Sequence, residues 1–379
     1  MRIGIVCHPS IGGSGLVATQ LGLGLAEMGH EVHFISSSRP FKLLESCDNV
    51  YFHDVEAIYY PLFSGSLYTF ALTAKIVEVV KQFELDIVHA HYSIPHSLCV
   101  YLANQIVTRK FPTVTTIHGT DVSVIGQDKP LYPLNQFSIN QSTRVTTVSA
   151  YQQEYIRTNF EIRKSIEVIH NFIDIKQFSP QRACGKLRKT LADDDEKIIM
   201  HVSTFRPLKN VRAVIHSFHQ VMDKIDARLV LVGSGPEVED TRKECQTLGI
   251  IDKVNFIGQV TNIESYIANA DCIIHPSYTE SFSMVLLEAM ASAVPAVSSN
   301  IDGIPEVVEA GVTGFMADPD DVDLLASHMI NILSDPGLHR QLGKQGRERA
   351  AKLFAPESKI KQYIECYESA IAEFSATIS

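Results

Sequence analysis

Short apolar runs alternate with longer amphipathic segments along the whole chain. In the first half they predict strands at 2–7, 31–35, 86–91, 113–118, 144–148 and 166–170, and a helix at 16–28 that Gly29 closes. In the second half they predict strands at 197–205, 228–232, 254–257, 271–275 and 296–299, and helices at 211–222, 237–248, 283–291 and 322–333. Apolar strands separated by helices are typical of a parallel sheet covered on both faces, so the pattern predicts an α/β protein.

The alternation is interrupted near residues 173–194, where a proline-containing segment and a basic stretch precede the acidic run 193–196. A chain of 379 residues also favours two domains. We therefore expect two Rossmann-like, doubly wound parallel-sheet domains with a cleft between them. The first would comprise residues 1–170 with a C-terminal helix at about 357–379, and the second residues 171–356. In such sheets, ligands bind beyond the carboxyl ends of the strands.

Composition narrows the classes of function. The net charge of −10 argues against binding nucleic acid or anionic membranes through overall charge. The 7 cysteines are scattered and never form a C-x-x-C pair, which favours a reducing cytoplasm over a disulfide framework or a zinc ribbon. No apolar run approaches the ~20 residues of a membrane span, and the first residues do not resemble a signal peptide. We expect a cytoplasmic protein without a stable membrane anchor, and the sequence leaves a homodimer open.

The segment from Glu280 to Glu288 is the most informative part of the chain. It places two glutamates on either side of an expected helix start, directly after the predicted strand 271–275. The unpaired N–H groups of a helix start suit a phosphate, and Glu288 would lie roughly 8 Å inside the helix, within reach of a nucleotide ribose. The segment therefore predicts a site for a nucleotide-linked substrate. A glycosidase pair is the weaker interpretation, because it requires facing carboxyl groups and this spacing leaves them roughly 80° apart.

Three loops of the second half have both a chemical and a structural interpretation. Arg206 and Lys209 follow the first predicted strand there, and two cations beside a strand end are either surface charges or a means of neutralising a diphosphate. The turn 233–236 (Gly-Ser-Gly-Pro) either begins a helix or forms a floor under a nucleotide. The segment 302–306 either contacts a ligand through amides exposed at its glycine or simply begins a helix.

The first half offers a glycine-rich loop and a histidine-containing strand end. The loop 9–15 lacks both G-x-G-x-x-G and a Walker lysine, so it is either a plain turn or a backbone clamp on a phosphate or carboxylate. His118 ends the predicted strand 113–118, and Tyr92 ends the neighbouring strand. Both would face the cleft, although a core histidine is an equally ordinary interpretation. The nearby histidines lack the spacing of a metal site, so we expect no metal.

Taken together, these motifs resemble those of the retaining family 4 glycosyltransferases of GT-B fold, over nearly the whole chain. The matching elements are E-x7-E at 280–288, G-[DS]-G-P at 233–236, G-I-P-E at 303–306 and G-x-T-G-[FY] at 311–315. The first half is more similar to the branch that joins N-acetylglucosamine from UDP-N-acetylglucosamine to the hydroxyl of L-malate, the first step of bacillithiol biosynthesis. The stretches that carry this similarity are 9–15, 29–35, 89–96, 115–121 and 170–174.

The resemblance implies a UDP-sugar-dependent, retaining hexosyltransferase that needs no essential metal and no cofactor. It implies catalytic roles for four side chains, which are His118, Arg206, Lys209 and Glu280. It implies donor contacts from Gly13, Gly15, Gly233, Ser283, Met284, Val285 and Glu288, and acceptor contacts from Ser14, Tyr92 and Thr120. One departure is that Arg206 and Lys209 are three residues apart, whereas the wider family usually spaces this pair by five, so the contact of Arg206 is less well defined.

Three alternatives remain open from the sequence. Another family 4 transferase could use an inositol phosphate or a sugar phosphate as acceptor, which would require further cations in the first domain. A nicotinamide-linked oxidoreductase is disfavoured by the absence of G-x-G-x-x-G. A non-catalytic sugar-binding protein is disfavoured by the set of diphosphate contacts.

Overall fold

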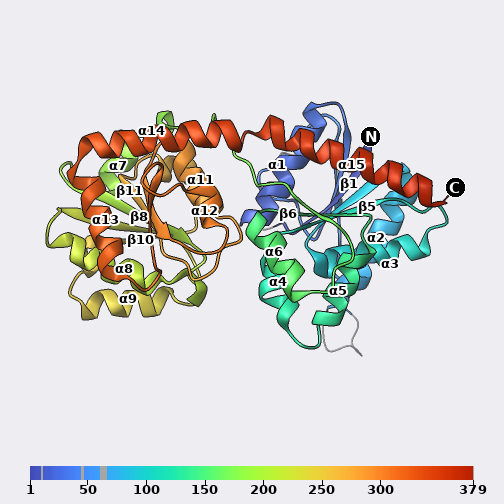
Figure 1. Cartoon of the computed structure of the whole chain (residues 1–379), viewed down its shortest axis with the longest axis horizontal. Helices are drawn as coiled ribbons and strands as arrows, with labels where there is room; N and C mark the ends of the chain where they lie inside the picture. Colours follow the sequence, from blue (N-terminus) through green and yellow to red (C-terminus); the bar gives the residue numbers. More distant parts are fainter. Residues whose placement is uncertain (10–11, 44–46, 60–65, 379) are drawn as a thin grey trace. The chain divides into compact units, whose positions relative to one another are not determined.

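The computed structural model of the chain describes residues 1–9, 12–43, 47–59 and 66–378 (Figure 1). The chain divides into two compact units. Unit 1 comprises Met1–Phe172 and Pro356–Ser379, and unit 2 comprises Ile173–Ala355. Each unit is a Rossmann-like α/β fold built on one parallel sheet, which confirms the predicted fold class.

In the described part of unit 1, seven parallel strands are ordered β3-β2-β1-β4-β5-β6-β7. The strands are β1 (Arg2–Val6), β2 (Glu31–Ser36), β3 (Val50–Asp54), β4 (Ile87–His91), β5 (Thr113–Ile117), β6 (Arg144–Thr147) and β7 (Ile166–Val168). The helices are α1 (Gly13–Glu27), α2 (Tyr68–Phe83), α3 (Leu98–Ile106), α4 (Thr120–Ser123), α5 (Tyr132–Gln141), α6 (Ala150–Asn159) and α15 (Pro356–Ile378). The direction of winding reverses between β1 and β4, which makes their carboxyl ends the switch point of this sheet.

Among the described residues of unit 2, six parallel strands are ordered β10-β9-β8-β11-β12-β13. The strands are β8 (Lys197–Ser203), β9 (Ala227–Gly233), β10 (Val254–Gly258), β11 (Cys272–His275), β12 (Ala296–Ser299) and β13 (Gly314–Ala317). The helices are α7 (Gly185–Leu191), α8 (Val211–Met222), α9 (Val238–Thr247), α10 (Ile263–Ile267), α11 (Met284–Ala291), α12 (Ile304–Val307), α13 (Val322–Ser334) and α14 (Pro336–Leu353). Here the winding reverses between β8 and β11.

The core of each unit forms between the sheet and the helices that cover it. In β1, Ile3 and Ile5 are fully buried, as expected for a central strand of a parallel sheet whose faces are covered by helices. Helix α8 buries Val214, Phe218 and Val221, which recur every three or four residues and therefore lie on one face. Burial of such side chains stabilises each unit by about 1.5–3 kcal/mol per large apolar residue.

The last helix of the chain belongs to unit 1. Helix α15, drawn in red, runs beside α1 and crosses the sheet near β5 (Figure 1). Tyr363 and Tyr367 of α15 are buried, and the Tyr367 hydroxyl lies 2.7 Å from Nδ1 of His89 on β4. The C-terminal segment is thus part of the core of unit 1 rather than an appendage of unit 2.

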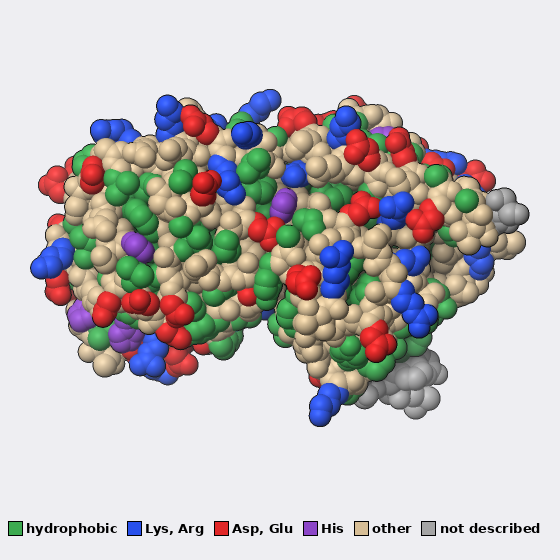
Figure 2. Space-filling view, in the orientation of Figure 1, with side chains coloured by type: hydrophobic (Ala, Val, Ile, Leu, Met, Phe, Trp, Pro, Cys, Tyr) green, Lys and Arg blue, Asp and Glu red, His purple; other side chains and the backbone are tan. Residues whose placement is uncertain are grey.

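The structure adds two strands that the apolar pattern does not predict. Each of them lies at one edge of its sheet, and the predicted strands β7 and β10 lie at the opposite edges. β3 is half exposed and ends in His53 and Asp54, and β13 directly follows a turn at Gly311, so the apolar signal of both strands is weak. In the described chain, no helix combines the length and apolar character needed to cross a membrane. On the face drawn in Figure 2, acidic and basic side chains are interspersed, so this face does not present one strong field of a single sign.

Candidate active site

The switch point of unit 2 brings together the two loops that follow β8 and β11. Because β8 and β11 are paired in parallel, their carboxyl ends lie next to each other. The loop after β8 contains Arg206 and Lys209, and the loop after β11 contains Glu280. Asn210 fixes the first loop, because it caps α8 by accepting from the Ala213 amide and donates its own amide to the carbonyl of Pro319 at 2.8 Å.

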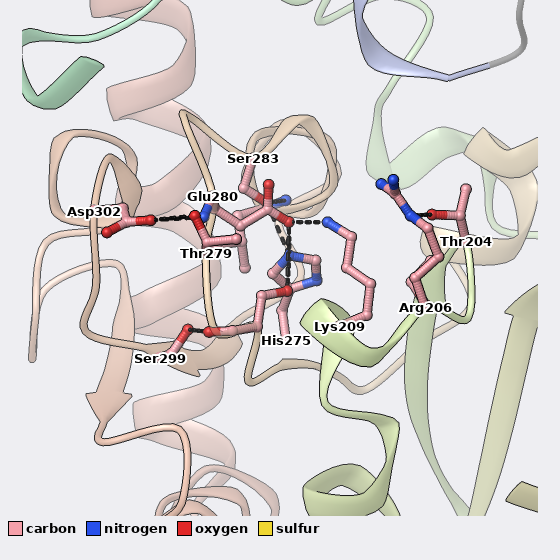
Figure 3. Close-up of polar contacts among 12 residues, drawn as sticks. Thr204, Arg206, Lys209, His275, Thr279, Glu280, Ser283, Ser299 and Asp302 are labelled. Atoms are coloured by element: carbon pink, nitrogen blue, oxygen red, sulfur yellow. Dashed lines mark hydrogen bonds and ion pairs between the residues drawn. The ribbon is translucent and has the colours of Figure 1, made fainter. Parts of the chain in front are cut away.

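Lys209 and Glu280 form an ion pair at this point (Figure 3). Their side chains are only 13% and 14% exposed, so water screens the pair weakly. His275, the last residue of β11, lies with Nε2 2.7 Å from the Glu280 carboxylate, and the Ser277 hydroxyl lies 3.4 Å from it. Three side chains from both loops therefore converge on one carboxylate.

The environment of Glu280 keeps its carboxyl group ionised. Burial by itself raises the pKa, but the charge of Lys209 and the hydrogen bonds from His275 and Lys209 outweigh burial and hold the pKa well below its usual range. An ionised carboxylate can only accept hydrogen bonds. The site thus presents a fixed negative oxygen beside a fixed ammonium group.

The backbone of Glu280 is held by the segment after β12. The Asp302 carboxylate accepts from the Thr279 hydroxyl at 2.6 Å and from the Glu280 amide at 3.1 Å (Figure 3). The amide of Gly303 donates to the Glu280 carbonyl at 3.0 Å. A Cβ atom at Gly303 would lie 2.0 Å from the carbonyl oxygen of Ser281, so only glycine allows this approach. The Gly303 amide is therefore used within the fold, which corrects the idea that it is exposed for a ligand.

The start of α11 follows the same loop, as predicted. Ser283 is the N-cap residue, with φ 72°, and its hydroxyl accepts from the Leu286 amide at 3.5 Å. The amides of Met284 and Val285 belong to the first turn, where a helix does not supply acceptors of its own. Glu288 lies one turn further on and is 6% exposed. The two glutamates of the E-x7-E motif therefore lie before the helix and inside it, and they are not a facing pair.

Gly233 and Arg206 lie at the carboxyl ends of the neighbouring strands β9 and β8. Gly233 ends β9 with φ 124°, and a Cβ atom there would lie 1.9 Å from the carbonyl oxygen of Ser203, so glycine is needed for the close approach of β9 to the end of β8. The Arg206 Nε donates to the hydroxyl of Thr204 at 3.1 Å, and this contact does not include Glu280. The structure thus joins Lys209 to Glu280 and leaves Arg206 as a neighbour on the loop.

In unit 1, the predicted residues gather at the carboxyl ends of β4 and β5. His118 Nε2 lies 2.9 Å from Nδ1 of His91, and the Tyr92 ring stacks on His118 at 5.7 Å between centroids. His8, which follows β1, packs edge-on against Tyr92 at 5.1 Å. Thr120 begins α4 directly after this group. Three of the predicted residues are thus neighbours at the switch point of unit 1.

The histidines of this group are held neutral. Burial and, to a smaller extent, the neighbouring His8 lower the pKa of His118 to about 3. Burial likewise lowers the pKa of His91 well below its usual range. The loop that carries them is held by Asp121, whose carboxylate accepts from the amides of Ser93 and Gly119. Burial raises the pKa of Asp121 to about 6.

Gly13, Ser14 and Gly15 form the first turn of α1. The helix begins without a side-chain cap at Gly12, and the Gly15 amide donates to the carbonyl of Gly12 at 3.1 Å. The predicted loop 9–15 also includes Ser10 and Ile11, which lie outside the described residues. Among the residues that are described, no group of three or more His, Cys, Asp or Glu side chains is arranged to hold a metal ion.

Several residues of both sites were not predicted. His275 and Asp302 act on Glu280, and His91 and Asp121 act on His118 and its loop. His275 is the last residue of the strand before the E-x7-E motif, and Asp302 precedes a glycine and has φ 51°. A polar residue at a strand end and an Asp-Gly pair are the sequence signals that point to such supporting positions.

Comparison with known proteins identifies the family. The family model Glycosyl transferases group 1 matches residues 186–349, and the model Glycosyltransferase Family 4 matches residues 11–177. N-acetyl-alpha-D-glucosaminyl L-malate synthase of Bacillus anthracis is 40% identical over 368 residues, which cover 97% of this chain and 96% of that protein. The chain therefore belongs to the family 4 glycosyltransferases of GT-B fold.

More distant relatives share the same architecture. MMP alpha-(1->4)-mannosyltransferase of Mycolicibacterium hassiacum is 28% identical and is covered over 100% of its length by 99% of this chain. Sucrose-phosphate synthase from Thermosynechococcus elongatus has a TM-score of 0.81 at 25% identity, with 98% of this chain and 99% of that chain covered. Anabaena HepE, solved with UDP and glucose, has a TM-score of 0.82 at 22% identity over 97% of this chain and 100% of that chain. At this identity, the likeness to HepE shows the fold alone.

Proposed function

We propose that this glycosyltransferase transfers N-acetylglucosamine from UDP-N-acetylglucosamine to the hydroxyl of L-malate, with retention of the anomeric configuration and without an essential metal. The observation that carries the proposal is the 40% identity, over almost the full length, to a protein named for this synthesis. The arrangement at the switch point of unit 2 supports it, because a desolvated lysine and an ionised glutamate lie beside the start of α11.

Unit 2 would bind the donor. Lys209 and Arg206 would stabilise the diphosphate as negative charge gathers on it, together with the first-turn amides of α11 from Ser283 to Val285. Glu288 would accept hydrogen bonds from the ribose hydroxyls, and Gly233 would let the nucleotide approach the end of β9. Glu280 would orient the sugar through its carboxylate. Lys209 and Glu280 are already fixed by their mutual contact, and Gly233 by its close approach to the carbonyl of Ser203.

Unit 1 would bind the acceptor and contact the sugar. The hydroxyls of Ser14, Tyr92 and Thr120 would bind malate, and the amides of the first turn of α1, at Gly13 and Gly15, would help to hold negative charge. His118 would bind or orient the sugar as a neutral donor or acceptor, since burial keeps its ring uncharged.

The reaction breaks one bond and forms another at the anomeric carbon. The bond from the anomeric carbon to the diphosphate oxygen breaks, and the bond to the malate hydroxyl oxygen forms on the same face of the sugar. The hydroxyl proton passes to the departing phosphate oxygen, so no protein base is required. Lys209 and the helix amides would lower the barrier because they are aimed at the oxygens on which charge develops, and each such donor contributes a few kcal/mol.

A second acceptor class has support of its own. D-inositol 3-phosphate glycosyltransferase of Kribbella flavida is 25% identical over 89% of this chain, and its name specifies a phosphorylated acceptor. Malate carries two carboxylates and an inositol phosphate carries a phosphate group, so both acceptors are anions. The neutral histidines and hydroxyls described around Tyr92 therefore do not distinguish them. The 40% identity to a protein named for malate synthesis is the observation that favours malate.

The test is incubation of the protein with UDP-N-acetylglucosamine and a panel of acceptors, with products read by mass spectrometry. We expect a malate-linked N-acetylglucosamine and one UDP released per product. A product formed only with an inositol phosphate or a sugar phosphate would overturn the malate assignment and leave the family intact. Addition of a chelator should leave turnover unchanged, and a loss that Mg²⁺ restores would contradict metal independence.

A further inference from the structure

The contacts of the Glu280 carboxylate all end on one of its two oxygens. Within the described chain, the recorded side-chain donors are Lys209 Nζ, His275 Nε2 and the Ser277 hydroxyl, and each of them contacts Oε1. Figure 3 shows the second oxygen of Glu280 pointing away from Lys209 and His275. A carboxylate held by three donors on one oxygen presents its other oxygen in a fixed direction.

His275 is the member of this set whose position is set by the sheet. It is the last residue of β11 and is 1% exposed, with its strand paired to both β8 and β12. Lys209, in contrast, reaches Glu280 from a short helical turn after β8 through a long, flexible side chain. The imidazole ring has two rotatable bonds and is packed in the core, so it is the more rigid support for the carboxylate.

The hydrogen-bond pattern also defines the state of His275. Glu280 is ionised and can only accept, so Nε2 of His275 must carry the hydrogen and donate it. Nδ1 of His275 is buried and has no hydrogen-bond partner among the described residues. The Nε2–H group is thus the part of the His275 ring that holds the Glu280 carboxylate.

We propose that His275 is a positioning residue for catalysis, which fixes the Glu280 carboxylate by donating to Oε1 so that Oε2 faces the donor sugar. The proposal rests on the proposed function, because it assigns the sugar contact to Glu280. Its consequence is that removal of the His275 donor misplaces the carboxylate and leaves the binding of the nucleotide itself unchanged.

The experiment compares His275→Leu with His275→Gln. Leucine removes the donor, whereas the glutamine amide can replace the Nε2–H group at a similar reach. We expect His275→Leu to lower kcat about 10²-fold, as a misplaced group does when it acts on the reacting centre, and His275→Gln to recover most of this loss. The affinity for UDP alone, measured by calorimetry, should stay within about twofold in both variants, because UDP lacks the sugar.

His339→Leu is the matched control. His339 is also a histidine of unit 2 that holds β11, but it lies on α14 and its Nε2 lies 2.8 Å from the carbonyl oxygen of Asp271, at the end of the strand opposite to His275. We expect His339→Leu to lower the thermal stability while changing kcat by less than about threefold, since no contact of Glu280 is removed. A similar fall in kcat for His339→Leu and His275→Leu, or failure of His275→Gln to restore kcat, would overturn the positioning role.

The design separates failure of this proposal from failure of the proposed function. If the wild type uses another acceptor, the malate assignment fails, and the three variants are compared with that acceptor. If the wild type forms the malate product and His275→Leu turns over at the wild-type rate, the positioning role alone fails. Should His275→Leu fail to bind UDP, His275→Asn takes its place, because the shorter amide keeps the side chain polar but does not reach Oε1 as Nε2 does. A kcat lowered about 10²-fold in His275→Asn and largely restored in His275→Gln supports the role, and equal kcat values in the two variants contradict it.

Discussion

Both units have polar side chains at the switch point of their sheet, but these side chains are charged in unit 2 and neutral in unit 1. At the switch point of unit 2, Lys209 and Glu280 are both charged and paired with each other. At the switch point of unit 1, the polar groups are His8, Tyr92 and His118, and burial keeps these histidines neutral. The same sheet topology therefore presents ions in one unit and neutral hydrogen-bonding groups in the other.

This difference matches the proposed division of labour. Charge develops on the diphosphate in the transition state, and preorganised charges lower a barrier most where charge develops. The acceptor hydroxyl has to be held and aimed, for which neutral donors and acceptors are sufficient. The two carboxylates of malate would be held by hydroxyls and by the first-turn amides of α1. We infer that the choice of charged or neutral residues at each switch point follows from what the bound group does during the reaction.

The largest effect that would test this contrast is the acid sensitivity of unit 1. Burial lowers the pKa of His89 and of His96 to about 3, from 6.5 in the unfolded chain. The unfolded state thus binds more protons between these values, so stability is full above pH 6.5 and falls as pH drops toward 3. Each of these buried histidines should therefore lower the free energy of unfolding by on the order of 2 kcal/mol between pH 7 and pH 5.

Other groups modify this prediction in a known direction. The pKa of Asp121 is raised to about 6, so protonation of Asp121 increases the free energy of unfolding as pH falls through 6. At pH 5 this increase offsets about 1 kcal/mol of the loss from the histidines.

Among the described histidines of unit 2, burial lowers the pKa of His201 to about 3 and also lowers the pKa of His328. Glu196 has a pKa lowered to about 2, because hydrogen bonds from Arg228 and Lys253 outweigh burial, and its contribution is lost only as pH falls below 4.5. Unit 1 should therefore lose stability first.

The measurement is amide hydrogen exchange, resolved by peptide, at pH 7 and pH 5 with correction for the intrinsic rates. We expect protection to fall more in peptides of β4 and β5 than in peptides of β8 and β11. Equal loss in both units would show that the buried histidines of unit 1 do not remain neutral, and the contrast between the units would then disappear.

The sequence is sufficient to predict the fold because buried parallel strands have the simplest pattern in the chain. The central strands β1 and β8 are largely apolar, whereas β3 was missed because it is half exposed and ends in polar residues, and β13 because it directly follows a turn. The helix start at Ser283 was predicted from its place after a strand. Rules of this kind depend on local spacing, which a single sequence displays directly.

The supporting residues could not be predicted because they act across long sequence separations. Asp302 reaches Glu280 from 22 residues away, and Lys209 pairs with Glu280 across 71 residues. The fold, rather than the spacing, decides that these groups meet. His275 shows the intermediate case, since its position at a strand end was visible but its partner could be any group at that edge of the sheet.

The second prediction concerns Lys209, on the charged side of the comparison. Lys209→Ala should lower kcat by about 10²- to 10³-fold, because one donor aimed at the developing charge is lost. Glu280 would retain the donors His275 and Ser277, so the fold should persist. The measurement is steady-state turnover together with thermal unfolding.

Lys209→Arg is the informative control for this prediction. It keeps a positive charge but changes the shape of the donor, so it should lie between the wild type and Lys209→Ala if charge and placement both matter. Wild-type turnover in Lys209→Ala, with the fold intact, would remove lysine from the proposed mechanism and would leave the ion pair with a structural role only.

The smallest predicted effect separates the two substrates, one unit at a time. Glu288→Gln should weaken the binding of UDP about tenfold, because a neutral amide replaces a carboxylate that would accept from both ribose hydroxyls. Tyr92→Phe should instead raise the KM for malate several-fold, because it removes one neutral hydroxyl worth roughly 1 kcal/mol, and it should leave the affinity for UDP unchanged.

Calorimetry with UDP and steady-state kinetics with malate, applied to both variants, give four values. Glu288→Gln should change only the affinity for UDP, and Tyr92→Phe should change only the KM for malate. A change in UDP affinity in Tyr92→Phe, or a change in the malate KM alone in Glu288→Gln, would show that donor and acceptor are not divided between the units as proposed. The reciprocal design matters because a general loss of stability would shift all four values together, whereas a division of the substrates between charged and neutral switch points predicts two changes and two constants.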